Sequence, residues 1–203
     1  MDKLKLQSLL VLLFALSTIP SFAQEGFIEG YIITTQQDTL YGEVKDRTRE
    51  PFGKLYRKIR LKQNGKLFTK KYSPSDVISY RKGEDLFESI WLKEKSEFFK
   101  TVYISEKGVG EQRFLKVVLK GDVSYYHVEW RDPDSGYYDY HGYLINRISD
   151  KSLYIRFDLF GISKKKVITY LNDCSAIINL LEEGDDPSIQ DMVTIYNTEC
   201  SAQ

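Results

Sequence analysis

Residues 113–145, RFLKVVLKGDVSYYHVEWRDPDSGYYDYHGYLI, constrain the fold more than any other stretch of this chain. The stretch is rich in β-branched and aromatic residues, and two groups of turn-forming residues interrupt it, at 121–122 and at 132–136. Runs of this composition that are bounded by turn residues are typical of consecutive antiparallel strands. The stretch therefore predicts three strands joined by two hairpin turns.

Similar patterns surround this stretch. Residues 64–65 are Asn-Gly, the strongest short-range signal for a hairpin, and they separate two runs that predict strands. The further predicted strands are residues 27–33, 39–44, 55–62, 66–72, 78–81, 86–92, 98–105 and 152–157. The basic side chains of Lys58, Arg60 and Lys62 would share one face of their strand. We interpret that face as solvated, with a basic binding groove as the alternative.

Helical spacing replaces strand alternation near the C-terminal end. The apolar positions that form one helical face are Val167, Tyr170, Leu171, Cys174, Ile177, Ile178 and Leu181, followed by Ile189, Met192, Val193 and Tyr196. Asp186-Pro187 are predicted to cap the second helix, and residues 73–76 predict a helix of one or two turns. The sequence thus predicts a mainly β (α+β) protein. An antiparallel, hairpin-rich sheet or sandwich-like layer over residues 24–166 would be covered by a helical hairpin over residues 167–200.

The N-terminal segment has the pattern of a secretory signal peptide. Lys3 and Lys5 precede an apolar run at residues 9–19, and small residues flank a cleavage point between Ala23 and Gln24. We therefore expect residues 1–23 to be removed on export, which would place the protein in the periplasm or at the outer envelope. No later segment is long and apolar enough for a membrane-spanning helix.

The overall charge is balanced, with 29 basic and 29 acidic residues. The whole chain therefore has no net field that would attract nucleic acid, and no nucleic-acid partner is expected. Motifs for a catalytic nucleophile, a phosphate-binding loop or a zinc protease are absent from the sequence, and no cofactor is expected. A pair of carboxylates distant in sequence could still support hydrolysis.

Cys174 and Cys200 are the only two cysteines and predict one disulfide, because export would place them in an oxidising compartment. The geometry leaves this open. In a regular helical hairpin Cys174 would face a residue near 195, so that Cys200 would lie about 7.5 Å further along the axis. The bond requires the chain after Tyr196 to leave that regular path.

Two groups of residues in the central stretch are candidates for a site. Tyr137, Tyr138 and Tyr140 beside a loop, with Trp130 opposite, could stack on a sugar or an apolar ligand. The alternative is that these aromatic residues simply cover a half-buried sheet surface.

The second group depends on the register of the hairpin. If residues 133–135 form the loop, His127 lies opposite His141 and Glu129 lies opposite Asp139. Two histidines beside two carboxylates could hold a divalent transition metal, whereas the alternative is an ordinary polar sheet face.

The opening hairpin resembles a family of secreted proteins. Residues 30–33 (GYII) and 38–44 (DTLYGEV) are similar to the opening of uncharacterised secreted envelope proteins of the Bacteroidetes, which have a glycine strand followed by Gly-Asp-Thr-Leu-x-Gly, often ahead of an outer-membrane barrel. Residues 72–77, the turn at Gly121 and the C-terminal segments around 173–174 and 196–197 fit the same family. The resemblance implies an envelope location and brings no catalytic residues.

Two functions follow from the sequence. The first is a non-catalytic binding or interaction module of the cell envelope, with an envelope protein or a glycan as its partner. The alternative is a secreted hydrolase, for example one acting on glycans, with a dispersed carboxylate site.

Overall fold

The computed structural model describes residues 26–47, 55–97, 100–131, 138–148, 152–155 and 164–201. The strands are β1 (Ile28–Thr34), β2 (Thr39–Arg47), β3 (Leu55–Gln63), β4 (Thr69–Tyr72), β5 (Val77–Lys82), β6 (Asp85–Glu97), β7 (Lys100–Ile104), β8 (Glu111–Leu119), β9 (Val123–Arg131), β10 (Tyr138–Asn146) and β11 (Ser152–Ile155). The helices are α2 (Lys164–Tyr170), α3 (Ser175–Glu182), α4 (Ile189–Ile195) and the π-helix η1 (Tyr196–Cys200). The prediction of a mainly β fold with a helical C-terminal region is confirmed.

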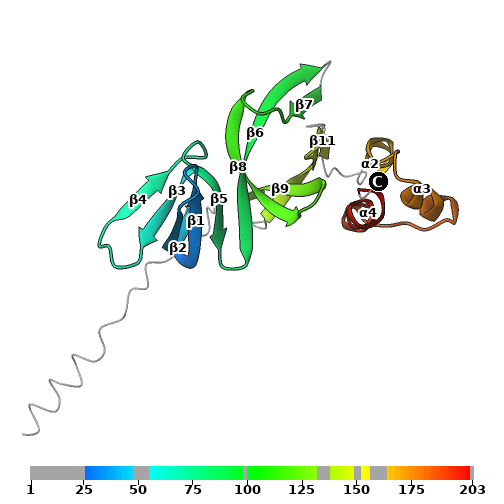
Figure 1. Ribbon diagram of the computed structural model, residues 1–203. Helices are drawn as coiled ribbons and strands as arrows, with labels where there is room; N and C mark the ends of the chain where they lie inside the picture. Colours follow the sequence, from blue (N-terminus) through cyan, green and yellow to red (C-terminus); the bar gives the residue numbers. More distant parts are fainter. Residues whose placement is uncertain are drawn as a thin grey trace, which may run out of the picture.

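The strands form one antiparallel sheet. Ten of them follow the order β11-β10-β9-β8-β6-β5-β1-β2-β3-β4, and β7 pairs with β6. Figure 1 shows β1–β5 on one side of β6 and β8, while β9 and β11 curl round on the other side towards β7. A hydrogen bond of 3.1 Å from the Ser105 amide to Ser152 Oγ helps to join the end of β7 to β11. The sheet therefore curls at both ends, and β6 and β8 take part in both curled parts.

The first core fills the curl of β1–β6. It consists of Ile32, Val44, Ile59, Leu61, Tyr72, Val77, Tyr80 and Phe87. Along β1 to β4 these residues alternate with exposed or half-buried ones, which is the pattern of strands that bury one face. The Tyr80 ring stacks on Phe87 with 4.6 Å between centroids and meets Phe114 edge-on at 4.9 Å.

A second core lies on the opposite face of β6 and β8. It consists of Ile90, Leu92, Leu115, Tyr126, Tyr143 and Ile145. Because successive side chains of a strand point to opposite faces, Phe87 and Ile90 of β6 serve different cores. β6 and β8 thus carry a core on each face.

The helices cover a third core. Val123, Tyr125, Leu144 and Ile155 of the sheet pack against Val167, Leu171, Cys174, Ile177, Ile189, Met192, Val193 and Tyr196. As a result β9 and β10 are also buried on both faces, with Tyr125 facing the helices and Tyr126 facing the second core. Figure 1 places these helices at the end of the molecule opposite β3 and β4.

The helix predicted at residues 73–76 is wrong. The Asp76 amide donates to the Ser73 carbonyl at 3.0 Å, and the Asp76 carboxylate accepts from the Ser73 amide at 2.9 Å. These are the contacts of a helix start, but they close only a turn. β5 begins directly afterwards because Val77 pairs with Thr34 of β1.

The C-terminal helices differ from the predicted hairpin in three places. α2 begins at Lys164, inside the range expected for the β domain, and it ends before a turn at residues 171–173 rather than continuing to 181. Ser188 caps α4, in place of the predicted Asp186-Pro187. The Ser188 hydroxyl accepts from the Asp191 amide at 3.1 Å and the Asp191 carboxylate accepts from the Ser188 amide at 3.0 Å, a reciprocal pair that favours this start.

The predicted signal peptide, including Ala23 and Gln24, lies outside the described residues. Within the described ranges, none of the helices has the length and apolar character needed to cross a membrane.

Candidate functional site

The strand register contradicts the predicted metal ladder. His127 of β9 pairs with Gly142, and His141 of β10 pairs with Val128. Directly paired residues of an antiparallel ladder share a face, so the two histidines project to opposite faces of the sheet. Glu129 pairs with Tyr140 and Asp139 pairs with Trp130, so the two predicted acidic ligands are not paired either. Among the described residues, no three His, Cys, Asp or Glu side chains gather as they would around a metal ion.

The reason for this error is that both faces of the hairpin are buried. The prediction chose the register that separates polar from apolar side chains, which requires one face to meet solvent. In the structure Tyr125 packs under the helices and Tyr126 packs in the second core, so polarity does not distinguish the two faces. The register is shifted by one residue, which moves every side chain of one strand to the other face.

Of the predicted ligand-binding aromatic residues, only Tyr140 has a described side chain. Its exposed fraction is 36 %, and its ring stacks on His127 with 3.9 Å between centroids. The backbone of Trp130 lies in β9 and pairs with Asp139, and the backbone of Tyr138 lies in β10 and pairs with Arg131. Tyr137 lies outside the described residues.

His127 is enclosed by aromatic rings. The Tyr125 ring meets it edge-on at 4.8 Å between centroids, and His127 Nε2 is buried with no hydrogen-bond partner in the described part of the chain. Burial and the nearby positive charge of Lys116 together lower the pKa of His127 to about 4. The imidazole is therefore neutral near pH 7.

A row of ion pairs, here called the charged seam, runs beside this ring. It consists of Lys82, Asp46, Arg47, Glu129, Lys116 and Asp85, in the order in which they contact one another. Arg47 contacts Asp46 at 3.0 Å and Glu129 at 3.4 Å. Lys116 contacts Glu129 at 3.1 Å and Asp85 at 3.0 Å. The seam brings together residues of β2, β5, β6, β8 and β9.

Asp46 is the most deeply buried member of the charged seam, with an exposed fraction of 1 %. It accepts hydrogen bonds from Lys82 and from the Tyr80 hydroxyl, the latter at 3.1 Å. Burial alone would raise the pKa of Asp46, but the hydrogen bond from Arg47 and the charges of Lys82 and Arg47 hold it below its usual value. Burial and the neighbouring Asp46 charge raise the pKa of the Tyr80 hydroxyl.

The carboxyl groups with shifted pKa values in the described chain do not have the property of a general acid. A general acid near neutral pH needs a carboxyl group with a raised pKa. Among the described residues, the carboxyl groups with a shifted pKa are Asp46, Asp76, Glu88 and Asp191, and the shift is downward in each. The charged seam joins strands of the two parts of the sheet through a continuous row of ion pairs.

A groove on the β1–β2–β3 part of the sheet is the better candidate for a ligand site. It has a volume of about 680 Å³, and its walls include Glu29, Tyr41, Glu43, Lys62, Gln63 and Asn64. Tyr41 is 61 % exposed and lies against Tyr31, with 5.9 Å between ring centroids. Glu43 and Lys62 form an ion pair of 3.2 Å at the groove.

Two paired glycines shape this groove. Gly30 lies opposite Gly42, and a Cβ at Gly30 would lie 1.9 Å from the Arg81 carbonyl oxygen. A Cβ at Gly42 would lie 2.2 Å from the Lys62 carbonyl oxygen. Neither backbone oxygen can move aside as a flexible side chain could, so both positions require glycine. Sequence reasoning missed the groove, although these glycines within predicted strands were the available signal.

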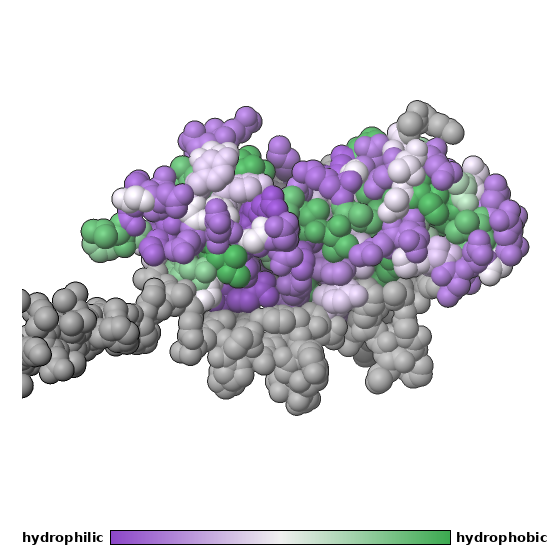
Figure 2. Space-filling view, turned by 90° about the horizontal axis from the view of Figure 1, so that it is seen from below, coloured by the Kyte–Doolittle hydropathy of each residue, from purple (hydrophilic) through white to green (hydrophobic). Residues whose placement is uncertain are grey.

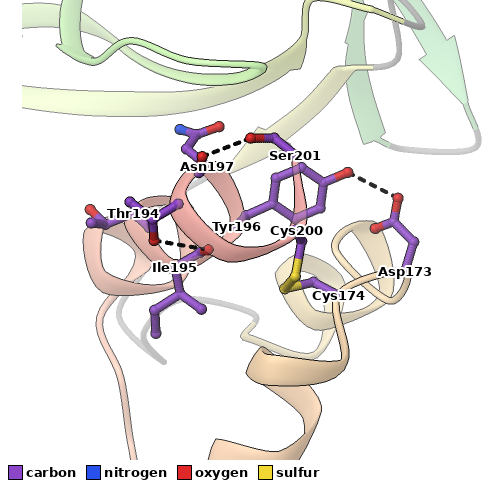
Figure 3. Close-up of a disulfide and its surroundings, with 9 residues drawn as sticks. Asp173, Cys174, Thr194, Ile195, Tyr196, Asn197, Cys200 and Ser201 are labelled. Atoms are coloured by element: carbon purple, nitrogen blue, oxygen red, sulfur yellow. Dashed lines mark hydrogen bonds between the residues drawn. A yellow bond between two sulfur atoms is a disulfide. The ribbon is translucent and has the colours of Figure 1, made fainter. Parts of the chain in front are cut away.

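The predicted disulfide is confirmed. Cys174 and Cys200 are bonded, with 5.5 Å between their Cα atoms, and Figure 3 shows the bridge beneath Tyr196. The expected offset is removed because Cys174 is the residue before α3 rather than part of one long helix, and because the chain from Tyr196 to Cys200 is a π-helix with a wider turn.

Two further contacts hold this region. The Tyr196 hydroxyl donates to Asp173 at 2.9 Å (Figure 3). The Asn197 side chain accepts from the Val123 amide at 2.9 Å and donates to the Val123 carbonyl at 2.8 Å, so it satisfies both backbone groups of the first residue of β9. The disulfide is thus part of a structural anchor.

Comparisons of this chain with protein-family models, with curated proteins and with solved structures find no match.

Proposed function

We propose that this chain is a non-catalytic binding module of the cell envelope, and that the groove on β1, β2 and β3 holds a glycan. The observation that carries this proposal is the exposed Tyr41 ring beside a set of polar groups in a groove of about 680 Å³. An aromatic face can stack on a sugar ring while its polar neighbours bond the hydroxyl groups.

The polar lining suits a neutral, hydroxyl-rich ligand. Glu43 and Lys62 neutralise each other across 3.2 Å, while the amide groups of Gln63 and Asn64 offer both donors and acceptors. Such a lining provides hydrogen bonds of both kinds without strong net charge. A glycan fits this chemistry better than a charged metabolite.

Envelope location is supported by three features. The N-terminal segment has the signal-peptide pattern, and the opening hairpin resembles secreted envelope proteins of the Bacteroidetes. The Cys174–Cys200 disulfide is the third, because such bonds persist in oxidising compartments. The alternative of a hydrolase lacks comparable support, since the pKa of each shifted carboxyl group in the described chain is lowered.

Binding to an array of neutral envelope oligosaccharides tests the proposal, with Tyr41→Ala as the diagnostic variant. Loss of the stacking ring should weaken the affinity by about tenfold. Tyr140→Ala is the matched control, because it removes a partly exposed tyrosine from a different part of the sheet. Loss of binding in Tyr140→Ala with retention in Tyr41→Ala would move the site to β9 and β10. Absence of binding to every glycan would reject a glycan ligand.

A further inference from the structure

The β3–β4 hairpin concentrates positive charge in a chain that is neutral as a whole. Between residues 57 and 71 there are seven basic residues and no acidic one: Arg57, Lys58, Arg60, Lys62, Lys66, Lys70 and Lys71. The formal net charge of the chain is zero, so the other residues together have a net charge of −7. The balanced total therefore conceals a strongly uneven distribution.

The tip of this hairpin also exposes two adjacent apolar side chains. Leu67 is 92 % exposed and Phe68 is 86 % exposed, and Lys66 beside them is exposed as well. Figure 2 shows apolar atoms projecting at the end of the molecule that lies away from the helices. Single exposed apolar residues are common on proteins, but an adjacent pair within a basic hairpin is a feature of interaction surfaces.

Protection of the sheet edge accounts for only part of this pattern. β4 is the last strand of the sheet, and exposed lysines such as Lys70 and Lys71 discourage pairing with another chain. Exposed leucine and phenylalanine have the opposite effect, because they favour association. Edge protection therefore explains the lysines of β4 but leaves Leu67 and Phe68 without a role.

We propose that the β3–β4 hairpin docks on an anionic lipid bilayer. Leu67 and Phe68 enter the boundary between headgroups and acyl chains, while the flanking lysines contact lipid phosphates. The apolar pair favours a bilayer over a nucleic acid or a soluble polyanion, which offer charge without an apolar layer. The remaining negative charge is repelled by the same surface, which orients the molecule with its helices away from the bilayer.

This orientation would bring the groove close to the bilayer surface. Lys66 and Leu67 belong both to the hairpin tip and to the groove wall. A docked hairpin would therefore hold Tyr41 next to the headgroup layer, where envelope glycans attached to lipid would be presented. Docking itself does not depend on the groove having a glycan ligand.

Co-sedimentation with vesicles tests the docking. The probe is the chain from Gln24 onward, which lacks the apolar segment 9–19 that would itself enter a bilayer. We expect binding to mixed phosphatidylcholine–phosphatidylglycerol vesicles and none to phosphatidylcholine alone. The triple variant K66Q/K70Q/K71Q should bind about 100-fold more weakly, since each lysine near an anionic surface contributes roughly fivefold.

A matched triple variant separates local from general electrostatics. K107Q/K165Q/K166Q removes the same charge from exposed lysines elsewhere in the described chain. It should bind the vesicles almost as strongly as the unmodified chain, because its three lost charges lie outside the docking hairpin. An equal loss in both triple variants would overturn the proposal, as would failure of the unmodified chain to bind anionic vesicles at low salt.

The double variant L67S/F68S tests the apolar contribution. At an ionic strength near 0.15 M, where the screening length is about 8 Å, we expect this variant to lose most of its vesicle binding. Ile148→Ser, which removes a 74 % exposed apolar residue elsewhere, should leave binding unchanged. Undiminished binding of L67S/F68S to the vesicles would show a purely electrostatic contact and would overturn the insertion of Leu67 and Phe68 into the bilayer.

Discussion

At the helix end of the molecule β9 and β10 are covered on both faces, whereas at the hairpin end β3 and β4 leave Leu67 and Phe68 exposed by 92 % and 86 %. The helix end is also held by the Cys174–Cys200 bond and by the contacts of Asn197 with Val123. The hairpin end has basic side chains in place of such a cover.

This difference indicates that the helix end contributes mainly to the stability of the fold, whereas the hairpin end is available for binding. Residues at the helix end pack against one another and form hydrogen bonds and a disulfide, so their substitution should lower the free energy of unfolding. Residues at the hairpin tip have few contacts to lose, so their substitution should change binding and leave stability almost intact. The charged seam lies between the two ends and should influence the stability of both.

The largest expected effect is at the charged seam. Asp46→Ala leaves Lys82, which is 8 % exposed, as a buried charge that has lost its contact with the Asp46 carboxylate. Breaking a buried ion pair in this way should lower the free energy of unfolding by about 3–5 kcal/mol. Urea denaturation followed by circular dichroism measures the change. Glu84→Ala removes the acid of the exposed Arg81–Glu84 pair and should have little effect, and equal effects of both variants would contradict a special role for the seam.

Removal of the disulfide should have the next largest effect. The bond joins residues separated by 26 positions, and the double variant C174A/C200A should lose roughly 3–4 kcal/mol of unfolding free energy. Thermal denaturation of the variant, beside the unmodified protein with and without reductant, measures this loss. An unchanged transition would mean that packing alone holds the helices on the sheet.

His127 should give stability a moderate dependence on pH. Its pKa is lowered to about 4 in the folded chain from 6.5, so between these values the unfolded chain binds a proton that the folded chain excludes. Stability should therefore fall as the pH falls from 6.5 to 4, by on the order of 1–2 kcal/mol after allowance for solvent screening.

The variant His127→Gln isolates this contribution. Its unfolding free energy should be nearly independent of pH from about 6.5 down to about 5.5, because Glu88 and Asp46, whose usual pKa values are 4.5 and 3.8, affect stability only at lower pH. Denaturation at a series of pH values gives the slope for both proteins. A slope that is the same in the variant would assign the dependence to another group.

The smallest expected effect on stability is at the hairpin tip. L67S/F68S should change the free energy of unfolding by no more than about 0.5 kcal/mol, because both side chains are almost fully exposed. Urea denaturation of this variant measures the change. A large loss would mean that the tip packs against another part of the chain, and the contrast between the two ends would then be wrong.

Much of the sheet could be predicted from local sequence. The hairpin around Asn64-Gly65 is confirmed, because a left-handed residue is required there and Gly65 has a φ of 74°. The turn between β1 and β2 is confirmed as well, with Gln37 at a φ of 69°. Signals of this kind depend on residues close together in the sequence.

The rest depends on contacts that the sequence does not display. Arg47 and Glu129 are 82 positions apart, and only the strand order brings them together. The register of β9 and β10 could not be read from polarity because a core covers each face. The groove was missed for a related reason, since the requirement for Gly30 and Gly42 comes from carbonyl groups of neighbouring strands.

The anchor formed by Tyr196, Asn197 and Cys200 also sets an order in time. Their partners Asp173, Val123 and Cys174 lie earlier in the chain, so each contact can form only after its own C-terminal residue has emerged. The first core is complete much sooner, because its buried residues all precede residue 88. A chain that emerges from its N-terminus first can therefore form the first core before the helices cover β9 and β10.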